Sequence, residues 1–204
     1  MLTDKTRIAV FVSGGGTNLQ ALLDAGLENG EIVLVVSSSP KAYALERAGR
    51  AGIPTVVVSR KNCAGQDEFE AKIEAALKEN GVELIVLAGF LSILSPRFTA
   101  KYPKRILNIH PSLIPSFCGQ GYYGLRVHEE ALKRGVKVTG ATVHYVNEIP
   151  DGGEILLQKA VSVEPGDTAE TLQRRVMEQA EWKLLPQAVE LVSASIRREK
   201  DGRL

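Results

Sequence analysis

The chain has 204 residues, a net charge of +1 at pH 7 and a hydrophobic content of 44%. This composition allows a real core and argues against disorder, while the near-neutral charge argues against nucleic-acid binding. No apolar run reaches the roughly 18 residues of a membrane span, and the first seven residues lack the order of a signal peptide. Cys63 and Cys118 form neither a disulfide framework nor a metal-binding spacing. We therefore expect a cytoplasmic protein that binds small molecules, with no metal, nucleic-acid or membrane partner.

Short β-rich runs alternate with helical patterns over the first 110 residues. The expected strands cover 7–12, 32–36, 55–58, 84–88 and 105–109. The expected helices begin at Leu19, cover 42–51 and 67–79, and include a short one within 93–102. This alternation predicts parallel strands joined by right-handed crossovers, which is a doubly wound α/β sheet.

The pattern changes after the fifth strand. A loop over 111–123 precedes a helix over 125–134, and two longer strands follow over 136–146 and 154–163. Their short connection predicts a hairpin or a nearby antiparallel pair. A last helix is expected over 168–196, with a break or bend at Pro186. The chain shows no repeat and no linker, so we expect one domain over 1–204.

A glycine-rich turn, Ser13–Asn18, stands between the first strand and the first helix. Backbone N–H groups and a helix N-terminus in such a turn can hold an anion. We expect Gly15 to need a positive φ and Thr17 or Asn18 to cap the helix. Leu19 replaces the third glycine of a dinucleotide fingerprint, and no Gly-Lys-Ser/Thr of a Walker loop follows. A phosphate monoester site and a purely structural turn both remain open.

The stretch Asn108–Pro115 follows a strand and ends in a proline. On an extended backbone, Asn108 and His110 project to the same side. An amide donor beside an imidazole can hold an oxyanion and move a proton. An isolated pair of this kind is more often structural, so the rest of the chain has to decide.

Four motifs, taken together, decide between the structural and the functional interpretation. They are SGGGTNLQ at 13–20, LAGFLSILSP at 87–96, NIHPSLIPSF at 108–117 and HYVNEIPDGGEILLQ at 144–158. Their combination resembles the folate-dependent formyltransferase family over nearly the whole chain. The resemblance implies formyl transfer from 10-formyltetrahydrofolate to the amine of glycinamide ribonucleotide, a step of purine (IMP) synthesis, by direct attack through a tetrahedral intermediate.

The resemblance also implies which residues act. Asn108, His110 and Asp151 match the family's catalytic trio: Asn108 and a protonated His110 would stabilise the oxyanion, and Asp151 would orient His110 and relay protons through water. His144 would support them. The residues implied to bind the ribonucleotide are Gly14, Gly15, Gly16, Thr17, Asn18 and Glu181. Those implied to bind folate are Phe90, Leu91, Ser92, Ile93, Leu94, Asn108, Val146, Asn147, Glu148 and Asp151. Residues 1–110 would then form the phosphate-binding half, and residues 111–204 the folate-side and C-terminal half.

The chain also departs from the family pattern. Gln66 and Ser92 stand where some members carry arginines near the folate, and the loop over 116–126 is longer than expected. That loop brings Cys118 near the site as a bystander, and His128 is given no role. A formyl-folate hydrolase, a transferase acting on initiator tRNA and a non-enzymatic nucleotide-binding module are the rival functions. We expect a monomer or a homodimer.

Overall fold

The computed structural model describes residues 5–202 and contains a seven-stranded sheet in the order β3-β2-β1-β4-β5-β6-β7. The first five strands run parallel, whereas β6 is antiparallel to β5 and β7 is antiparallel to β6. The expected fold class, a mostly parallel doubly wound sheet with antiparallel C-terminal strands, is confirmed. The strands are β1 Thr6–Val12, β2 Gly30–Ser37, β3 Thr55–Val57, β4 Leu84–Leu87, β5 Ile106–His110, β6 Val138–Tyr145 and β7 Ile155–Ser162.

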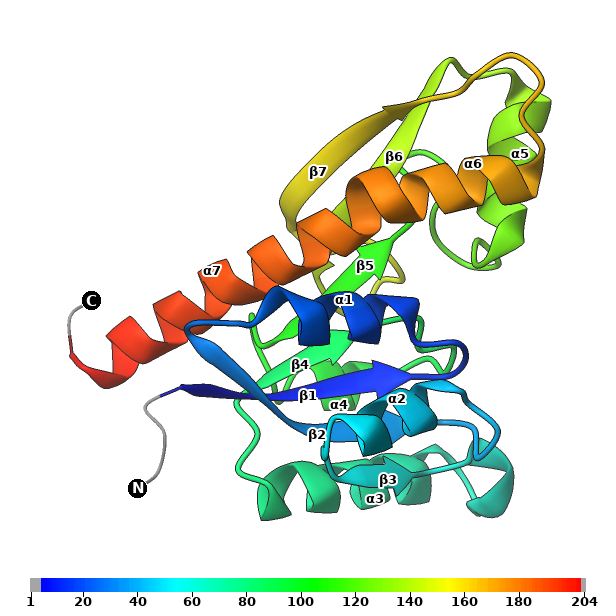
Figure 1. Ribbon diagram of the computed structural model, residues 1–204. Coiled ribbons are helices and arrows are strands. Elements are labelled where there is room, and N and C mark those ends of the chain that lie inside the picture. The colour runs from blue at the N-terminus through cyan, green and yellow to red at the C-terminus, as the bar shows by residue number, and fades with distance from the viewer. Residues whose placement is uncertain (1–4, 203–204) are drawn as a thin grey trace.

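Helices cover both faces of the sheet (Figure 1). The helices are α1 Thr17–Ala25, α2 Ala44–Arg50, α3 Gln66–Glu79, α4 Pro96–Thr99, α5 Leu125–Arg134, α6 Ala169–Val176 and α7 Trp182–Lys200, with a short 3₁₀ turn η1 at Arg60–Asn62. One core lies between the sheet and α1, α2, α6 and α7, and a second core lies under α3 and α4. Within residues 5–202, no helix is both long and apolar enough to cross a bilayer.

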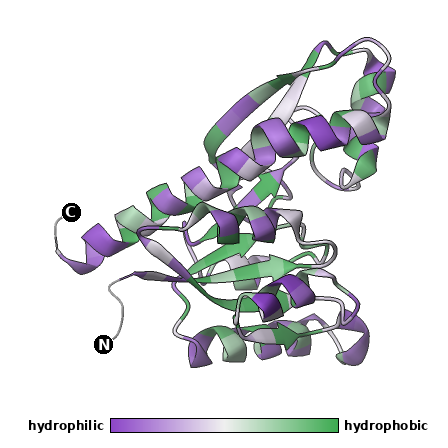
Figure 2. Ribbon diagram, viewed as in Figure 1, coloured by the Kyte–Doolittle hydropathy of each residue, from purple (hydrophilic) through white to green (hydrophobic). Residues whose placement is uncertain are grey.

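The run of residues 8–12 of β1 is apolar at every position because both faces of this central strand are covered. Ile8 and Val10 of β1 face the first core, and Ala9 and Phe11 face the second. This two-sided burial explains why β1 reads as a continuous apolar run rather than an alternating one. Figure 2 shows the hydrophobic colour concentrated in these inner strands, with hydrophilic residues on the outer helices.

The C-terminal helix is interrupted, but not where the sequence predicted. A π-helical segment, η2 Met177–Glu181, separates α6 from α7, and the Trp182 N–H donates to the carbonyl of Met177, five residues earlier. Pro186 lies inside α7, which continues through it to Lys200. The expected break at Pro186 is therefore wrong, and the irregularity ends five residues before it, whereas a bend at Pro186 stays a prediction. Such π segments often mark functional positions, and this one contains Glu181.

The strand order determines where a site can form. The chain leaves β1 towards β2 on one side, and β4 lies on the other side of β1. In open α/β sheets, ligands bind beyond the carboxyl ends of the strands at such a reversal. Three loops meet there: the glycine-rich turn after β1, the loop of residues 88–95 after β4, and the loop of residues 111–124 after β5.

Candidate functional site

Asn108 and His144 form a cross-strand pair at the end of β5. The two residues are direct partners in the antiparallel register of β5 and β6. The His144 Nδ1 lies 2.8 Å from the Tyr145 carbonyl, which can only accept, so Nδ1 carries the proton. The other ring nitrogen, Nε2, then accepts from the Asn108 amide at 3.1 Å. His144 thereby orients Asn108 so that its Nδ2 donor group points towards Asp151.

His110 is the last residue of β5, and only 4% of it is exposed. Its Nε2 lies 2.8 Å from the Phe117 carbonyl and donates to it, while Nδ1 faces the Asp151 Oδ2 at 3.5 Å. Burial lowers the pKa of His110, and the opposing effect of the Asp151 carboxylate does not reverse this. Burial thus favours the neutral imidazole in the ligand-free protein, and the role of a protonated His110 in the reaction stays a prediction.

Asp151 lies in the tight Asp-Gly-Gly turn before β7, with a positive φ of 55°. Its Oδ1 accepts from the Asn108 Nδ2 at 3.3 Å, and its Oδ2 accepts from the Gly119 N–H at 2.8 Å. Burial pushes the pKa of Asp151 upward, but the hydrogen bonds and the neighbouring imidazoles of His144 and His110 outweigh it, so the pKa is lowered. Asp151 is thus ionised at neutral pH and touches every other polar member of the cluster.

The loop after β5 supplies two of these contacts. The Phe117 carbonyl orients His110, and the Gly119 N–H holds Asp151. Phe117 itself has a positive φ of 50°. The sequence marked this loop only as unusually long, because main-chain groups leave no signature in the side-chain pattern. Cys118 lies between the two contacts, and its thiol donates to the Pro115 carbonyl at 3.3 Å.

The glycine-rich turn has a different geometry from the one expected. Gly16, not Gly15, has the positive φ of 71°, and a Cβ at Gly16 would lie 2.5 Å from the Ala44 Cβ. A Cβ at Gly15 would meet nothing within 4 Å. Gly16 is also the N-cap residue of α1, and no side chain of the described residues caps that helix, so the expected cap by Thr17 or Asn18 is wrong. The N–H groups of the first turn of α1 keep their hydrogen-bonding capacity for an anion.

Arg47 supports this turn from α2, a contact that sequence spacing did not reveal. Its Nε donates to the Gly15 carbonyl at 2.9 Å, and its guanidinium stacks 5.1 Å from the centre of the Tyr43 ring. The stacked and hydrogen-bonded arginine fixes the turn and adds a positive charge beside it.

Asn18 points across to the π segment. Its Nδ2 donates to the Glu181 Oε2 at 2.8 Å, whereas its Oδ1 is buried without a partner among the described residues. Burial raises the pKa of Glu181, which is 6% exposed. The unpartnered Oδ1 of Asn18 is a buried acceptor that suits a ligand presenting a hydroxyl group.

Two adjoining cavities bring the sequence-predicted site residues together. The first, of about 430 Å³, is lined by all six predicted ribonucleotide residues and by Asn108, His110 and Asp151. The second, of about 150 Å³, is lined by all ten predicted folate residues and by His144. Phe90, Leu91, Asn108 and Asp151 line both cavities. The polar cluster therefore lies at the boundary between them. Among residues 5–202, no group of three or more His, Cys, Asp or Glu is arranged to hold a metal ion.

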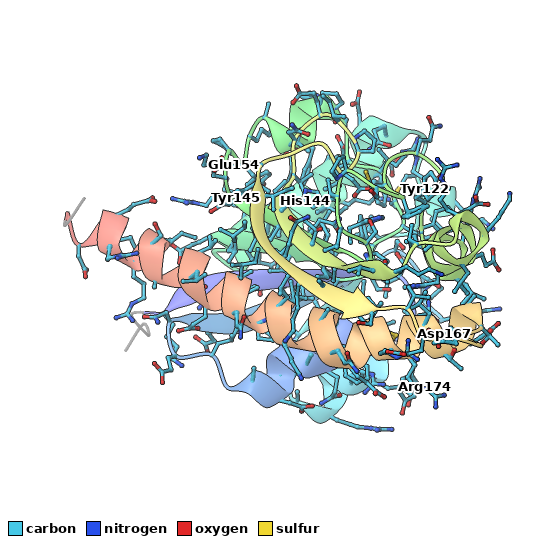
Figure 3. All side chains as sticks on the ribbon, turned by 90° about the horizontal axis from the view of Figure 1, so that it is seen from above. Tyr122, His144, Tyr145, Glu154, Asp167 and Arg174 are labelled. Carbon is cyan, nitrogen blue, oxygen red and sulfur yellow. The ribbon has the colours of Figure 1, made fainter. Side chains whose placement is uncertain are left out.

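The sequence missed several residues that line the first cavity. They include His128 of α5, Gln173 of α6, Met177 of the π segment, and Tyr122 and Tyr123 of the long loop. Figure 3 shows His144 near the middle of the molecule and Tyr122 towards the end that carries α5. His128 is fully buried, and neither of its ring nitrogens has a partner in the described part of the chain. On its helix, His128 occupies a position that looks like an ordinary core position in the sequence. Only the tertiary structure shows that it lines the cavity.

Comparison with known proteins agrees with this geometry. The family model described as formyl transferase matches residues 6–189. The chain belongs to the formyl transferase family.

Individual members of this family are similar to the chain over most of its length. The chain is 41% identical to phosphoribosylglycinamide formyltransferase of Haemophilus influenzae, over 96% of this chain and 91% of that protein. The crystal structure of glycinamide ribonucleotide transformylase 1 from Symbiobacterium toebii superimposes with a TM-score of 0.87 at 40% identity, covering 95% of this chain and 90% of the other. The chain is also 47% identical to the trifunctional purine biosynthetic protein adenosine-3 of Gallus gallus, over 94% of this chain but only 19% of that protein's length.

The buried His128 of this formyl transferase predicts a loss of stability in acid. Burial lowers the pKa of His128 to about 4, so folding favours the neutral ring. The stabilising effect is complete above the unfolded pKa near 6.5 and is lost as the pH falls towards 4. Between pH 7 and pH 5, we expect the free energy of unfolding to drop about 2 kcal/mol more in the wild type than in His128→Asn. Urea unfolding of both proteins at the two pH values measures this. Equal drops would show that His128 does not titrate on unfolding.

Proposed function

We propose that this chain is a phosphoribosylglycinamide formyltransferase. It would transfer the formyl group of 10-formyltetrahydrofolate to the amine of glycinamide ribonucleotide in purine synthesis. The observation that carries the proposal is the junction of two cavities at Asn108 and Asp151, with His110 and His144 in contact with Asp151. The names of the relatives and the match of the family model support the same reaction.

The first cavity suits a phosphorylated ribose. The N-terminus of α1 and the glycine-rich turn offer N–H groups to a phosphate, with Arg47 contributing positive charge nearby. Glu181 and the free Oδ1 of Asn18 offer acceptors to ribose hydroxyl groups. A nucleotide held at these points would extend its glycine amine towards Asn108, and this tethering supplies the proximity that a free amine lacks.

The second cavity suits the flat ring of a folate. Its lining combines apolar side chains, among them Leu87, Phe90 and Leu94, with polar groups of Asn147 and Glu148 at the rim. A cavity of about 150 Å³ is the size that holds one aromatic ring in other proteins. The rest of the cosubstrate would lie along the exposed side chains of Leu91 and Ile93. The formyl group would then reach the junction where the two cavities share Asn108.

Asn108 would stabilise the charge that develops on the formyl oxygen. Attack by the amine forms a C–N bond and pushes the carbonyl electrons onto oxygen. The Asn108 amide already donates to His144 and, at a longer 3.3 Å, to Asp151. The developing oxyanion would take over the longer bond. Losing one such preorganised donor costs on the order of 10²–10³ in rate elsewhere.

His110 and Asp151 would move the protons. The attacking amine must lose a proton, and the departing folate nitrogen must gain one as its bond to the formyl carbon breaks. The neutral His110 has a free lone pair on Nδ1, and the imidazolium that forms would be stabilised by Asp151 at 3.5 Å. Asp151 would pass the proton onward through water to the leaving nitrogen.

The central test is whether formyl loss depends on the acceptor. The cluster can stabilise a tetrahedral centre but provides no nucleophile of its own. We therefore expect almost no tetrahydrofolate production from 10-formyltetrahydrofolate alone, and rapid production once glycinamide ribonucleotide is added. Absorbance of the released tetrahydrofolate follows both phases. Rapid formate release without the acceptor would instead identify a hydrolase.

Substitution within the trio tests the roles of its members. We expect His110→Ala and Asp151→Asn each to lower kcat by at least ~10²-fold, because a proton carrier or its charged partner is lost. The affinity for either substrate should change far less. Cys118→Ala, in the same loop region, serves as the control and should retain wild-type turnover. Near-normal kcat in either trio variant would refute its catalytic role.

The glycine-rich turn gives a substitution that separates binding from folding. A side chain at Gly15 meets no protein atom, so Gly15→Val should fold normally but obstruct the approach of a phosphate. We expect at least ~10-fold weaker binding of glycinamide ribonucleotide and unchanged folate binding. Calorimetric titration with each ligand distinguishes these effects. Parallel loss of both affinities would point to a general disturbance, and retention of both would remove the turn from the binding site.

A further inference from the structure

The loop after β4, residues 88–95, forms the wall shared by the two cavities, and its packing is uneven. Ala88 and Leu94 are buried in the two cores, whereas Leu91 is 62% exposed and Ile93 is 69% exposed. The exposed part of the loop gains little from the hydrophobic effect. Its conformation therefore depends largely on polar anchors.

The first part of the loop is anchored to β1 and to the glycine-rich turn. The Ala88 N–H donates to the Phe11 carbonyl at 2.9 Å, and the Leu91 N–H donates to the Ser13 Oγ at 2.9 Å. These contacts position the half of the loop that lines the ribonucleotide cavity.

The second part is anchored by α3. Glu70 is fully buried, and its two carboxylate oxygens accept from the Ser95 N–H and the Ser95 hydroxyl, each at 2.6 Å. Gln66 donates through its Nε2 to Glu70 and, at 3.1 Å, to the Ile93 carbonyl. Glu70 and Gln66 together therefore hold the main chain of the loop at two points.

The cap of α4 does not by itself require a buried charge at Glu70. Ser95 caps that four-residue helix by accepting from the Phe98 N–H, while its hydroxyl proton goes to Glu70, a role that any acceptor could fill. Burial raises the pKa of Glu70, but the Ser95 and Gln66 hydrogen bonds outweigh it and the pKa is lowered, so Glu70 is ionised. Charged acceptors form stronger hydrogen bonds than neutral ones, which suits the exposed part of the loop that burial holds only weakly.

We propose that Glu70 is a positioning residue for the folate cosubstrate, acting through Ser95 and Gln66 on the loop wall of the second cavity. This inference rests on the proposed function for the identity of the cosubstrate. Gln66 stands where some family members carry an arginine, and here its amide serves the loop rather than a ligand. Loss of the network should loosen residues 92–95 and leave the Ser13-anchored end, and hence acceptor binding, in place.

The test compares Glu70→Gln with Glu74→Gln. Both substitutions remove one negative charge from α3, but Glu74 pairs with the Lys101 ammonium instead of the loop. For Glu70→Gln we expect a roughly tenfold higher KM for 10-formyltetrahydrofolate and a similar loss of tetrahydrofolate affinity by calorimetry. The kcat and the KM for glycinamide ribonucleotide should stay within about twofold of the wild type, and Glu74→Gln should match the wild type throughout.

Hydrogen exchange supplies a readout that does not need turnover. The amides of residues 92–95 should exchange faster in Glu70→Gln and not in Glu74→Gln. Gln66→Ala, at the surface, provides a variant that carries no risk to folding and should raise the KM for 10-formyltetrahydrofolate by roughly threefold. Because both side chains act in one network, the double variant should resemble Glu70→Gln rather than the product of the two effects.

The outcomes separate this inference from the proposed function. Unchanged tetrahydrofolate affinity and unchanged exchange in Glu70→Gln would overturn the positioning role while leaving the transferase proposal intact. Weakened tetrahydrofolate binding and faster exchange, in a protein that does not formylate glycinamide ribonucleotide, would support the positioning role and refute the proposed acceptor. A wild type that binds no tetrahydrofolate would overturn both.

Discussion

The antiparallel pairing of β6 with β5 is the constraint on which the site depends. In a purely parallel sheet, another crossover would follow β5, and the next strand would run in the same direction as β5. Reversal instead brings His144 directly opposite Asn108, and the turn that follows β6 carries Asp151 back over the end of β5. Three polar side chains from distant parts of the chain thus meet at one strand end.

The turn itself requires its glycines. A Cβ at Gly153 would lie 1.7 Å from the Tyr145 carbonyl oxygen, and one at Gly152 would lie 2.6 Å from the Ile149 side chain. Both contacts are too close for any other residue, so the turn can fold tightly against β6 only with glycine at these positions. Asp151 accepts a positive φ in the same turn, a conformation that aspartate tolerates better than most residues. The position of Asp151 in the polar cluster therefore depends directly on the glycines of this turn.

Around this cluster, separate sets of loops line the two cavities that we propose for the two substrates. The turn after β1 and the π segment face the first cavity, and the loop after β4 faces the second. Hydrogen bonds from the Leu91 N–H to Ser13 and from the Ser95 hydroxyl to Glu70 fix the wall between them. Such a division lets an amine and a formyl group approach from two sides, which is what transfer between two bound molecules requires. Relatives named for this reaction share the fold over most of this chain.

The sequence by itself determined the fold class, because strand and helix periods alternate clearly through residue 110 and a short connection marks the antiparallel pair after it. The motifs at 108–117 and 144–158 also sufficed to name Asn108, His110 and Asp151, since turn residues and polar side chains leave a local signature. The tertiary structure decided the rest. That Gly16 rather than Gly15 takes the positive φ depends on the approach of Ala44, and the protonation of His110 depends on its burial. The π segment at Glu181, the unpartnered His128 and the main-chain contacts of Phe117 and Gly119 arise from packing between distant segments. Local sequence carries no record of such contacts, because their energies depend on neighbours that only folding supplies.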